Sequence, residues 1–246
     1  MTIWLPAGFF ATALLYASVG FGGGSTYNAL LALVGFDYQL LPIVSLACNV
    51  VVVTGSTVRF ARAGEMPWMP ALTLALIAAP LAFLGGLTPI KQATFLLVLG
   101  FSLVGAGFAL LLPRASELEA KPTPLARFMA PVVAPLGYLA GLVGIGGGIF
   151  LAPVLHLTRW NNARRIAATT SLFILINSIA GIAGQLAKNG PERFAEALSG
   201  ALPLLIAVVL GGQLGSVLAL RLLPERVIRW LTAALTIWAG SRLLIG

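Results

Sequence analysis

Two clusters of glycine stand at matching places in long apolar stretches of the chain. Residues 20–24 read GFGGG, and residues 144–148 read GIGGG at an offset of 124. Three adjacent glycines weaken a helix, because glycine has no side chain to pack and leaves the backbone loose. We expect helices to begin after these breaks, at Ser25 and Ile149. The start of such a helix presents unpaired N–H groups and the positive end of its dipole, and glycine lets a ligand approach closely. The pattern therefore favours the binding of an anion.

Close packing is the alternative explanation, since small residues also let membrane helices approach one another. For one GxGGG motif the two explanations are equally good, but broken helices at repeat-related positions are typical of a transporter binding site. We predict that the anion-binding site contains the glycines and the first residues of the helix that follows the first break. These residues are Gly22, Gly23, Gly24, Ser25, Thr26, Gly146, Gly147 and Gly148.

Polar side chains within the apolar stretches supply the rest of the predicted site. Asn49 lies on a helix expected at 41–61, and Thr170 and Asn177 share a face of a helix expected at 164–187. Buried Ser, Thr and Asn also join helices or bond to the backbone, and for a single residue both roles stay open. The two asparagines are favoured, because an amide is costly to bury without partners. We therefore add Asn49, Thr170 and Asn177 to the site.

The acidic residues all lie at the ends of segments or in loops, which leaves the predicted membrane interior without a carboxylate. A proton relay or a cation site would need one there, whereas an anion pathway is favoured by its absence. The seven are Asp37, Glu65, Glu117, Glu119, Glu192, Glu196 and Glu225.

The composition is that of an integral membrane protein. Hydrophobic residues make up 59% of the chain and charged residues 9%, against about 25% charged in soluble domains. Five uncharged stretches exceed the roughly 20 residues that a spanning helix needs: 38–58, 66–90, 92–113, 166–187 and 197–220. No basic region opens the chain, so we expect the first segment to be retained. The net charge of +8 indicates membrane topology rather than nucleic-acid binding.

The similarity between the halves continues beyond the glycines, at an offset that becomes 126. Gly64 then matches Gly190, and the segment 84–86 matches 210–212. We predict an all-α membrane protein of two inverted repeats, each a glycine-broken re-entrant helical hairpin plus three transmembrane helices. The first repeat is 1–112, the cytoplasmic linker 113–126 and the second repeat 127–246. Three crossings per repeat, an odd number, make the repeats inverted.

The basic residues favour re-entrant hairpins over arms that cross the membrane. Full crossing would divide the 15 basic residues 7 to 8 between the two sides, which carries no orientation signal. Hairpins place eleven on one side, which the positive-inside rule makes cytoplasmic, and both termini then face outward. Whether the arms cross fully stays open at this point. The outer side keeps Lys91, Lys188, Arg193 and Arg242.

The glycine-rich segments resemble those of the sulfite exporter TauE/SafE family. The segments GFGGGSTYNALLAL and GLVGIGGGIFLAPVL carry the resemblance, together with the later ATTSLFILIN, and it spans essentially the whole chain. It implies a bacterial inner-membrane permease that exports sulfite, sulfoacetate or related sulfur-containing or organic anions. The motif says little about which anion, and the first copy has Ser25 and Thr26 where the second has Ile149 and Phe150.

We expect a secondary transporter that works by alternating access, with a small anion and the lipid bilayer as partners. A homodimer is compatible with the sequence, and no cofactor, metal or nucleic acid is expected. A Gly147→Leu change is expected to block flux with little loss of folded protein. Two other classes stay open. One is a membrane assembly subunit without transport activity, and the other is an intramembrane enzyme, which would need more than the one histidine and one cysteine of this chain.

Overall fold

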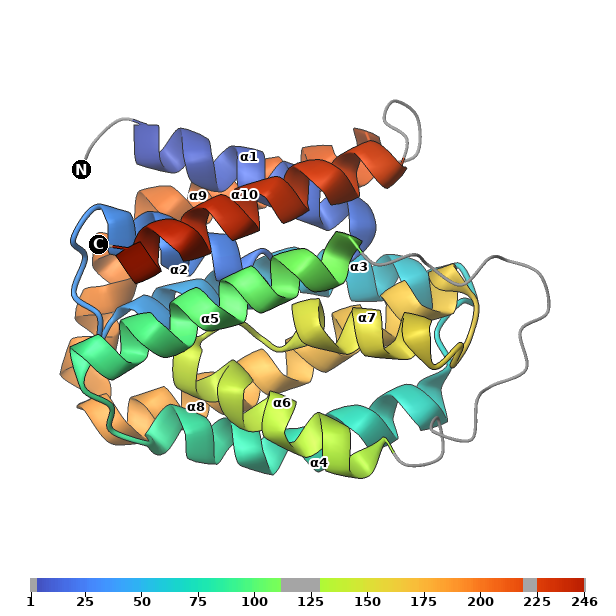
Figure 1. The fold of residues 1–246 in the computed structure, drawn as a ribbon, viewed down its shortest axis with the longest axis horizontal. Coiled ribbons are helices and arrows are strands. Elements are labelled where there is room, and N and C mark those ends of the chain that lie inside the picture. The colour runs from blue at the N-terminus through green and yellow to red at the C-terminus, as the bar shows by residue number, and fades with distance from the viewer. Residues whose placement is uncertain (1–3, 112–128, 219–224, 246) are drawn as a thin grey trace.

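The computed structural model describes residues 4–111, 129–218 and 225–245, and within these ranges the chain forms helices joined by short connections. The predicted linker 113–126 lies outside the described residues. The helices, drawn in Figure 1, are α1 (Trp4–Val19), α2 (Gly24–Leu33), α3 (Leu41–Arg62), α4 (Trp68–Leu87), α5 (Gln92–Leu111), α6 (Ala130–Val143), α7 (Gly148–Leu157), α8 (Ala163–Gly200), α9 (Leu202–Leu218) and α10 (Glu225–Ile245).

Each glycine cluster separates two short helices. Gly23, before α2, has a φ of 85°, and Gly147, before α7, has a φ of 77°. Residues with a side chain rarely adopt this left-handed conformation, so glycine is needed at both positions. The second arms begin at Gly24 and Gly148, one residue before the expected Ser25 and Ile149.

The chain reverses direction at both clusters (Figure 1). In the first hairpin the Phe9 ring on α1 stacks on the Tyr27 ring on α2, with centroids 4.7 Å apart. Further from the loop on both arms, Gly8 faces Leu30, so α1 and α2 run antiparallel. The arms α1, α2, α6 and α7 contain 16, 10, 14 and 10 residues, fewer than the roughly 20 of a full crossing.

Among the described residues, four helices are long and apolar enough to cross a membrane: α3, α4, α5 and α8. Helix α8 differs from the expected segment 164–187, because it continues to Gly200 with a kink at Gly190. Gly190 has φ 81° and ψ 164°, and Pro191 follows it. A proline lacks the N–H that would continue the helical hydrogen bonds, so the chain changes direction there.

Helices α3 and α8 run antiparallel through the centre of the molecule. Glu65, just after α3, pairs with Arg164 at the start of α8, and Leu46, near the start of α3, touches Gly181 on the later part of α8. Glycines bring the surrounding helices close. A side chain on Gly141 would overlap the Ala82 carbonyl, so α6 lies directly on α4.

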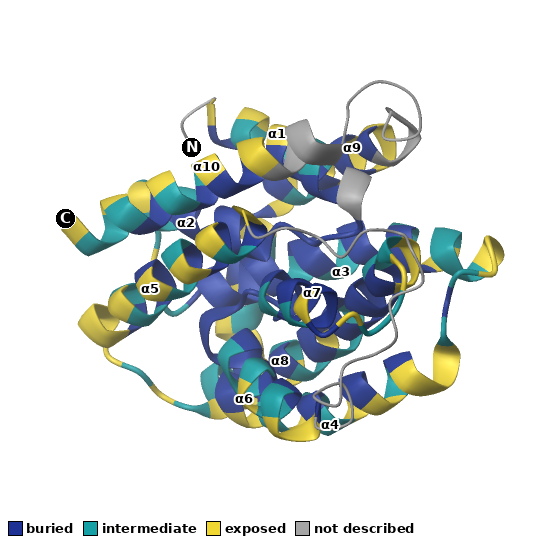
Figure 2. Cartoon of the chain, turned by 45° about the vertical axis from the view of Figure 1, so that its right-hand side comes forward, coloured by how far each residue is buried: buried dark blue, intermediate teal, exposed yellow. Residues whose placement is uncertain are grey.

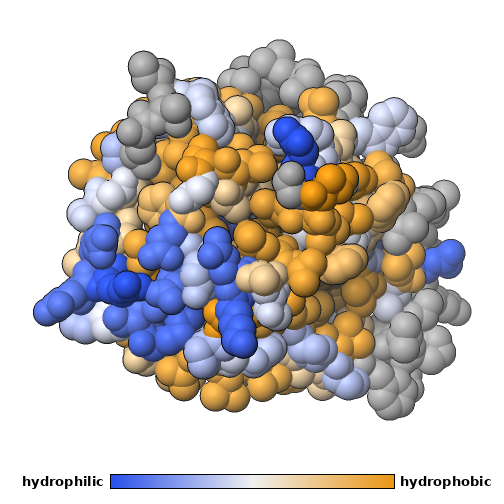
Figure 3. Space-filling model, turned by 60° about the vertical axis from the view of Figure 1, so that its left-hand side comes forward, coloured by the Kyte–Doolittle hydropathy of each residue, from blue (hydrophilic) through white to orange (hydrophobic). Residues whose placement is uncertain are grey.

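Buried residues gather where the helices face one another, and exposed residues lie on the outside (Figure 2). Many of the exposed residues are large and apolar. Met69, Phe101 and Trp230 are more than 60% exposed, which suits contact with lipid. Hydrophilic residues gather in one region of the face shown in Figure 3, while apolar residues cover most of the rest. These features are those of a multi-pass membrane protein.

Candidate anion-binding site

The two glycine loops meet at the side chain of Asn49, near the middle of α3. Its Oδ1 atom accepts a hydrogen bond of 2.8 Å from the backbone N–H of Gly24, the first residue of α2. Its Nδ2 atom donates a 3.1 Å bond to the carbonyl of Ile145, within the second loop. Asn49 is completely buried. One amide of the first half therefore holds the loops of both halves.

The first loop leaves no room for a side chain on the Asn49 side. A Cβ on Gly22 or on Gly24 would overlap the Asn49 amide. These two glycines are needed for close approach, whereas Gly23 is needed for its left-handed φ of 85°. Because Asn49 Oδ1 already occupies the N–H of Gly24, the N-terminus of α2 is partly satisfied without a ligand.

The second loop faces buried hydroxyl groups on α8 that have no hydrogen-bond partner among the described residues. A Cβ on Gly146 would lie 3.1 Å from Ser178 Oγ, and a Cβ on Gly148 would lie 2.9 Å from Thr170 Cγ2. Thr170 Oγ1 and Ser178 Oγ are both buried and both without a partner. One unpartnered hydroxyl, Ser178 Oγ, therefore lies beside the second loop, whereas Gly148 at the start of α7 meets carbon atoms of Ile174 and Thr170.

Asn28, which the sequence analysis did not select, forms a second bridge between the halves. Its Nδ2 atom donates a 2.6 Å bond to the Val143 carbonyl at the end of α6, and its Oδ1 atom accepts a 2.6 Å bond from Ser45 Oγ. The signal for Asn28 was its amide in the apolar arm that follows GFGGG. It was missed because polar partners were sought in the long helices and not in the hairpin arms.

Three predicted site residues have other contacts. Thr26 Oγ1 lies 2.9 Å and Ser25 Oγ 3.5 Å from Tyr16 Oη, which also contacts Thr236 on α10. These hydroxyls join α1, α2 and α10. Asn177 donates 2.8 Å to the Phe173 carbonyl of its own helix, while its Oδ1 is buried without a partner. Their part in ligand binding stays a prediction.

The charged groups near the ends of α3 and α8 lie away from the glycine loops. Asp37 pairs with Arg193 at 3.9 Å at one end, and Glu65 pairs with Arg164 and Arg165 at 3.7 and 3.9 Å at the other. Within the described ranges, no group of His, Cys, Asp and Glu residues could hold a metal ion. The centre of the site offers backbone N–H groups, hydroxyls and amides, which suit an anion without a metal.

The family model for sulfite exporter TauE/SafE matches residues 4–243, almost the whole length. The chain belongs to the sulfite exporter TauE/SafE family. Residues 4–243 of this TauE/SafE chain include both glycine loops and every residue of the candidate site.

Two relatives are called probable membrane transporter proteins. One, from Sinorhizobium fredii, is 33% identical over 98% of this chain and 98% of its own length. The other, from Methanocaldococcus jannaschii, is 25% identical over 73% of this chain and 70% of its own length. No solved structure gives a significant match.

Proposed function

We propose that this protein is a secondary membrane transporter that exports small sulfur-containing or organic anions, such as sulfite or sulfoacetate, by alternating access. The family and the names of the two relatives support a membrane transporter. The observation that carries the site is the convergence of both glycine loops on Asn49. In this proposal the anion binds at the two helix breaks.

The second loop is the stronger half of the proposed site. At the first loop the Gly24 N–H is bonded to Asn49. At an offset of 126, the residue that matches Asn49 is Leu175, which has no amide to cap α7. In the proposal the unpartnered hydroxyls of Thr170 and Ser178, on the part of α8 that packs against this loop, donate to an oxyanion at the N-terminus of α7.

Inverted repeats are supported by the positions of left-handed residues. Gly20 and Gly144 have φ near 80°, as do Gly23 and Gly147 at the same offset of 124. The offset also pairs Gly35 (φ 71°) with Arg159 (φ 50°), and Gly64 (φ 70°) pairs with Gly190 (φ 81°) at 126. Matching turns in both halves favour repeats 1–112 and 127–246, and the antiparallel α3 and α8 favour their inversion.

Membrane topology follows from the same repeats. In the proposal each hairpin is re-entrant. Its non-helical turn then lies at membrane depth, where such backbone is tolerated only inside the protein or beside a wet cavity. α1 begins and α10 ends at the same end of the molecule, and α5 ends and α6 begins at the opposite end (Figure 1). With the basic residues cytoplasmic, both termini face outward from a bacterial inner membrane. A homodimer stays a prediction.

The test is counterflow of labelled sulfite against a panel of small anions in proteoliposomes of the purified protein. We expect uptake driven by at least one sulfur-containing or organic anion. Gly148→Ala should reduce it strongly, because the added Cβ would press on Ile174 and Thr170. Gly105→Ala is the matched control, since nothing lies within 4 Å of a Cβ there. Absence of counterflow for every anion would favour the assembly subunit.

A further inference from the structure

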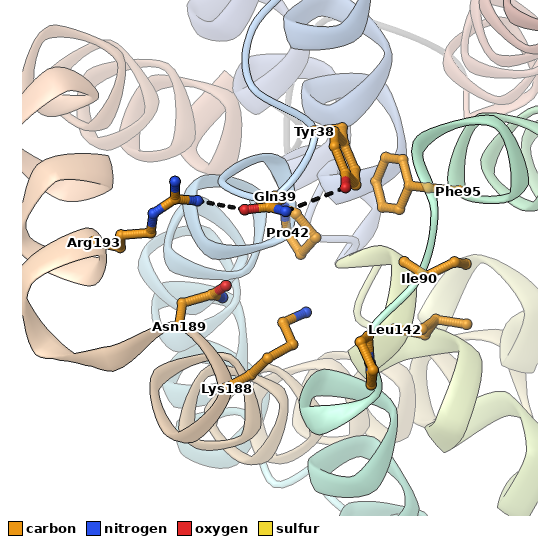
Figure 4. Close-up of a pocket in the computed structure, with 10 residues that line it drawn as sticks. Tyr38, Gln39, Pro42, Ile90, Phe95, Leu142, Lys188, Asn189 and Arg193 are labelled. Atoms are coloured by element: carbon orange, nitrogen blue, oxygen red, sulfur yellow. Dashed lines mark hydrogen bonds between the residues drawn. The ribbon is translucent and has the colours of Figure 1, made fainter.

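A cavity of about 370 Å³ lies between the start of α3, the connection from α4 to α5 and the α8 kink (Figure 4). It is distinct from the site at the glycine loops but adjoins it. Pro42 and Leu142 line the cavity, and Pro42 packs directly against Gly144 of the second loop. A ligand in this cavity would therefore be separated from the loop by one layer of residues.

Lys188 supplies the charge of this cavity. Its Nζ atom points into the space between Pro42 and Ile90 (Figure 4). Among the residues that the structure describes, none forms a hydrogen bond or an ion pair with the Lys188 ammonium group. Because a half-buried ammonium without a partner loses hydration, a bound anion would stabilise it.

The neighbouring polar groups are arranged around a different cation. Arg193 donates to Gln39 Oε1 and lies 3.9 Å from Asp37. Asp37 is thus paired with Arg193, and its charge is not directed at Lys188. Gln39 Nε2 donates a 3.2 Å bond to Tyr38 Oη, which leaves the hydroxyl proton of Tyr38 to donate to a ligand.

The other wall is apolar. Pro89, Ile90, Phe95 and Leu142 line it, and Phe95 and Leu142 are buried. The volume falls within the range of organic ligand sites, roughly 300–1,000 Å³. An inorganic oxyanion would contact Lys188 and leave the apolar wall uncovered.

We propose that this cavity binds an organic anion, a carboxylate or sulfonate with a short apolar body, at the outer mouth of the transport pathway. The acid group is held by Lys188 and the Tyr38 hydroxyl, and the body lies against Ile90 and Phe95. The proposal rests on the proposed function only for the direction of transport. Binding in the cavity can be measured without measuring flux. A lipid phosphate has the same head-group chemistry, so the test must distinguish the two sources.

The test measures binding by calorimetry with the full-length protein in phosphatidylcholine nanodiscs, with benzenesulfonate and sulfite as probes. Lys188→Gln should weaken benzenesulfonate binding about tenfold or more, the loss of one charge-assisted hydrogen bond. Lys91→Gln removes a charge at the same end of the molecule from a residue that does not line the cavity. It should change the affinity for benzenesulfonate by less than about twofold. Ile90→Ala should weaken benzenesulfonate binding but not sulfite binding.

Equal affinity in the wild type and Lys188→Gln would overturn the proposal. So would a phospholipid that mass spectrometry finds retained by the wild type and lost from Lys188→Gln, because the occupant would then be a lipid. Gly148→Ala separates this proposal from the function proposed above. It should reduce counterflow strongly while leaving benzenesulfonate binding at the mouth unchanged. Benzenesulfonate binding that depends on Gly148 and not on Lys188 would place the ligand at the loops and overturn the mouth site.

Discussion

Asn49 and Ile145 lie on different halves of the chain, yet Asn49 Nδ2 donates to the Ile145 carbonyl at 3.1 Å. The same amide accepts from Gly24 at 2.8 Å, so the two glycine loops cannot separate without breaking at least one of these bonds. In the proposed alternating access the two hairpins rock against the other helices. The bonds of Asn49 hold the present arrangement of the loops, and we propose that the same residue contacts the anion.

We predict that Asn49→Asp lowers anion flux and, because a carboxylate without a cationic partner is costly at this completely buried position, also lowers stability. The carboxylate still accepts from Gly24 but repels the Ile145 carbonyl, and its negative charge repels the substrate. A like charge at a binding site costs several kcal/mol, so flux should fall by more than about tenfold. Asn49→Leu is the comparison, since it removes both bonds and should lower stability by about 1–3 kcal/mol per unpaired group. Counterflow and thermal unfolding in detergent would measure both. Normal flux through Asn49→Asp would exclude Asn49 from the site.

The sequence predicts the local features well, because glycine and charge act over a few residues. The second arms begin within one residue of the expected Ser25 and Ile149, and α3 ends at Arg62 against an expected 61. The kink at Gly190 was missed, because two helices joined by a bend look like one apolar segment followed by a loop.

The side-chain partners could not be predicted, because they depend on contacts between the halves. Asn49 and Asn177 look equivalent in sequence, but Asn49 joins both loops while Asn177 donates to its own helix. Asn28 bonds to Val143, 115 residues away. The cavity beside Lys188 combines residues from 38 to 193, and no local pattern indicates it.

The glycine variants must be chosen by backbone conformation. Gly147→Leu, expected from the sequence to leave the fold intact, introduces a side chain at φ 77° and within 3.0 Å of Phe173 Cε1. That conformation costs roughly 1–2 kcal/mol for a residue with a Cβ, so lost flux would be mixed with lost stability. Gly148 has an ordinary φ and meets only side-chain atoms, which makes Gly148→Ala the better probe of the loop.

Helix packing gives a separate prediction about stability. Gly141→Leu should destabilise the protein by several kcal/mol, since any Cβ there overlaps the Ala82 carbonyl on α4 and backbone cannot give way. Gly105→Ala, on an open part of α5, should be neutral or slightly stabilising because alanine favours a helix. Thermal unfolding of both variants would measure the difference. Equal stability would mean that α6 and α4 are not in close contact.

Membrane topology can be tested with two single cysteines in a Cys48→Ser background. Ala63 and Glu192 are both exposed, near opposite ends of the antiparallel α3 and α8. In intact cells an impermeant maleimide should label Glu192→Cys and not Ala63→Cys, because the basic residues place the Ala63 end in the cytoplasm. Opening the cells should make Ala63→Cys reactive, which controls for its exposure. The reverse pattern would invert the proposed orientation.

The ion pairs at the two ends of α3 and α8 provide a test of alternating access. Glu65→Gln should release the pairs with Arg164 and Arg165 and favour opening at that end. Such exposed pairs are worth only about 0–1 kcal/mol, so stability should change little. A cysteine at the buried Ser56, in the Cys48→Ser background, should then react faster with a small maleimide. Asp37→Asn, which breaks the pair at the other end, should not have this effect. Identical rates in both variants would contradict gating by these pairs.

The last prediction concerns the energy source. Among the described residues, the buried polar groups around the loops are amides and hydroxyls, and the acidic residues lie at the ends of helices, between them, or after the kink in α8. A site without a carboxylate lacks the usual means to couple an anion to Na⁺ or protons. Export of an anion from a negative interior is already downhill by about 2.3 kcal/mol per charge per 100 mV. This corresponds to a gradient of about fiftyfold for a monovalent anion.

We therefore expect uniport that follows the membrane potential. Flux should be measured in proteoliposomes with the potential set by K⁺ and valinomycin, while pH and Na⁺ gradients are held at zero and then varied one at a time. Bisulfite could carry its own proton, so a sulfonate without a titrating group near neutral pH is the better substrate for this experiment. Asn49→Asp serves as the control for leak, because it should lose the protein-dependent flux in every condition. Flux that ignores the potential and follows a pH or Na⁺ gradient would contradict uniport, and Asn177, with its unpartnered Oδ1, would be the first coupling residue to test.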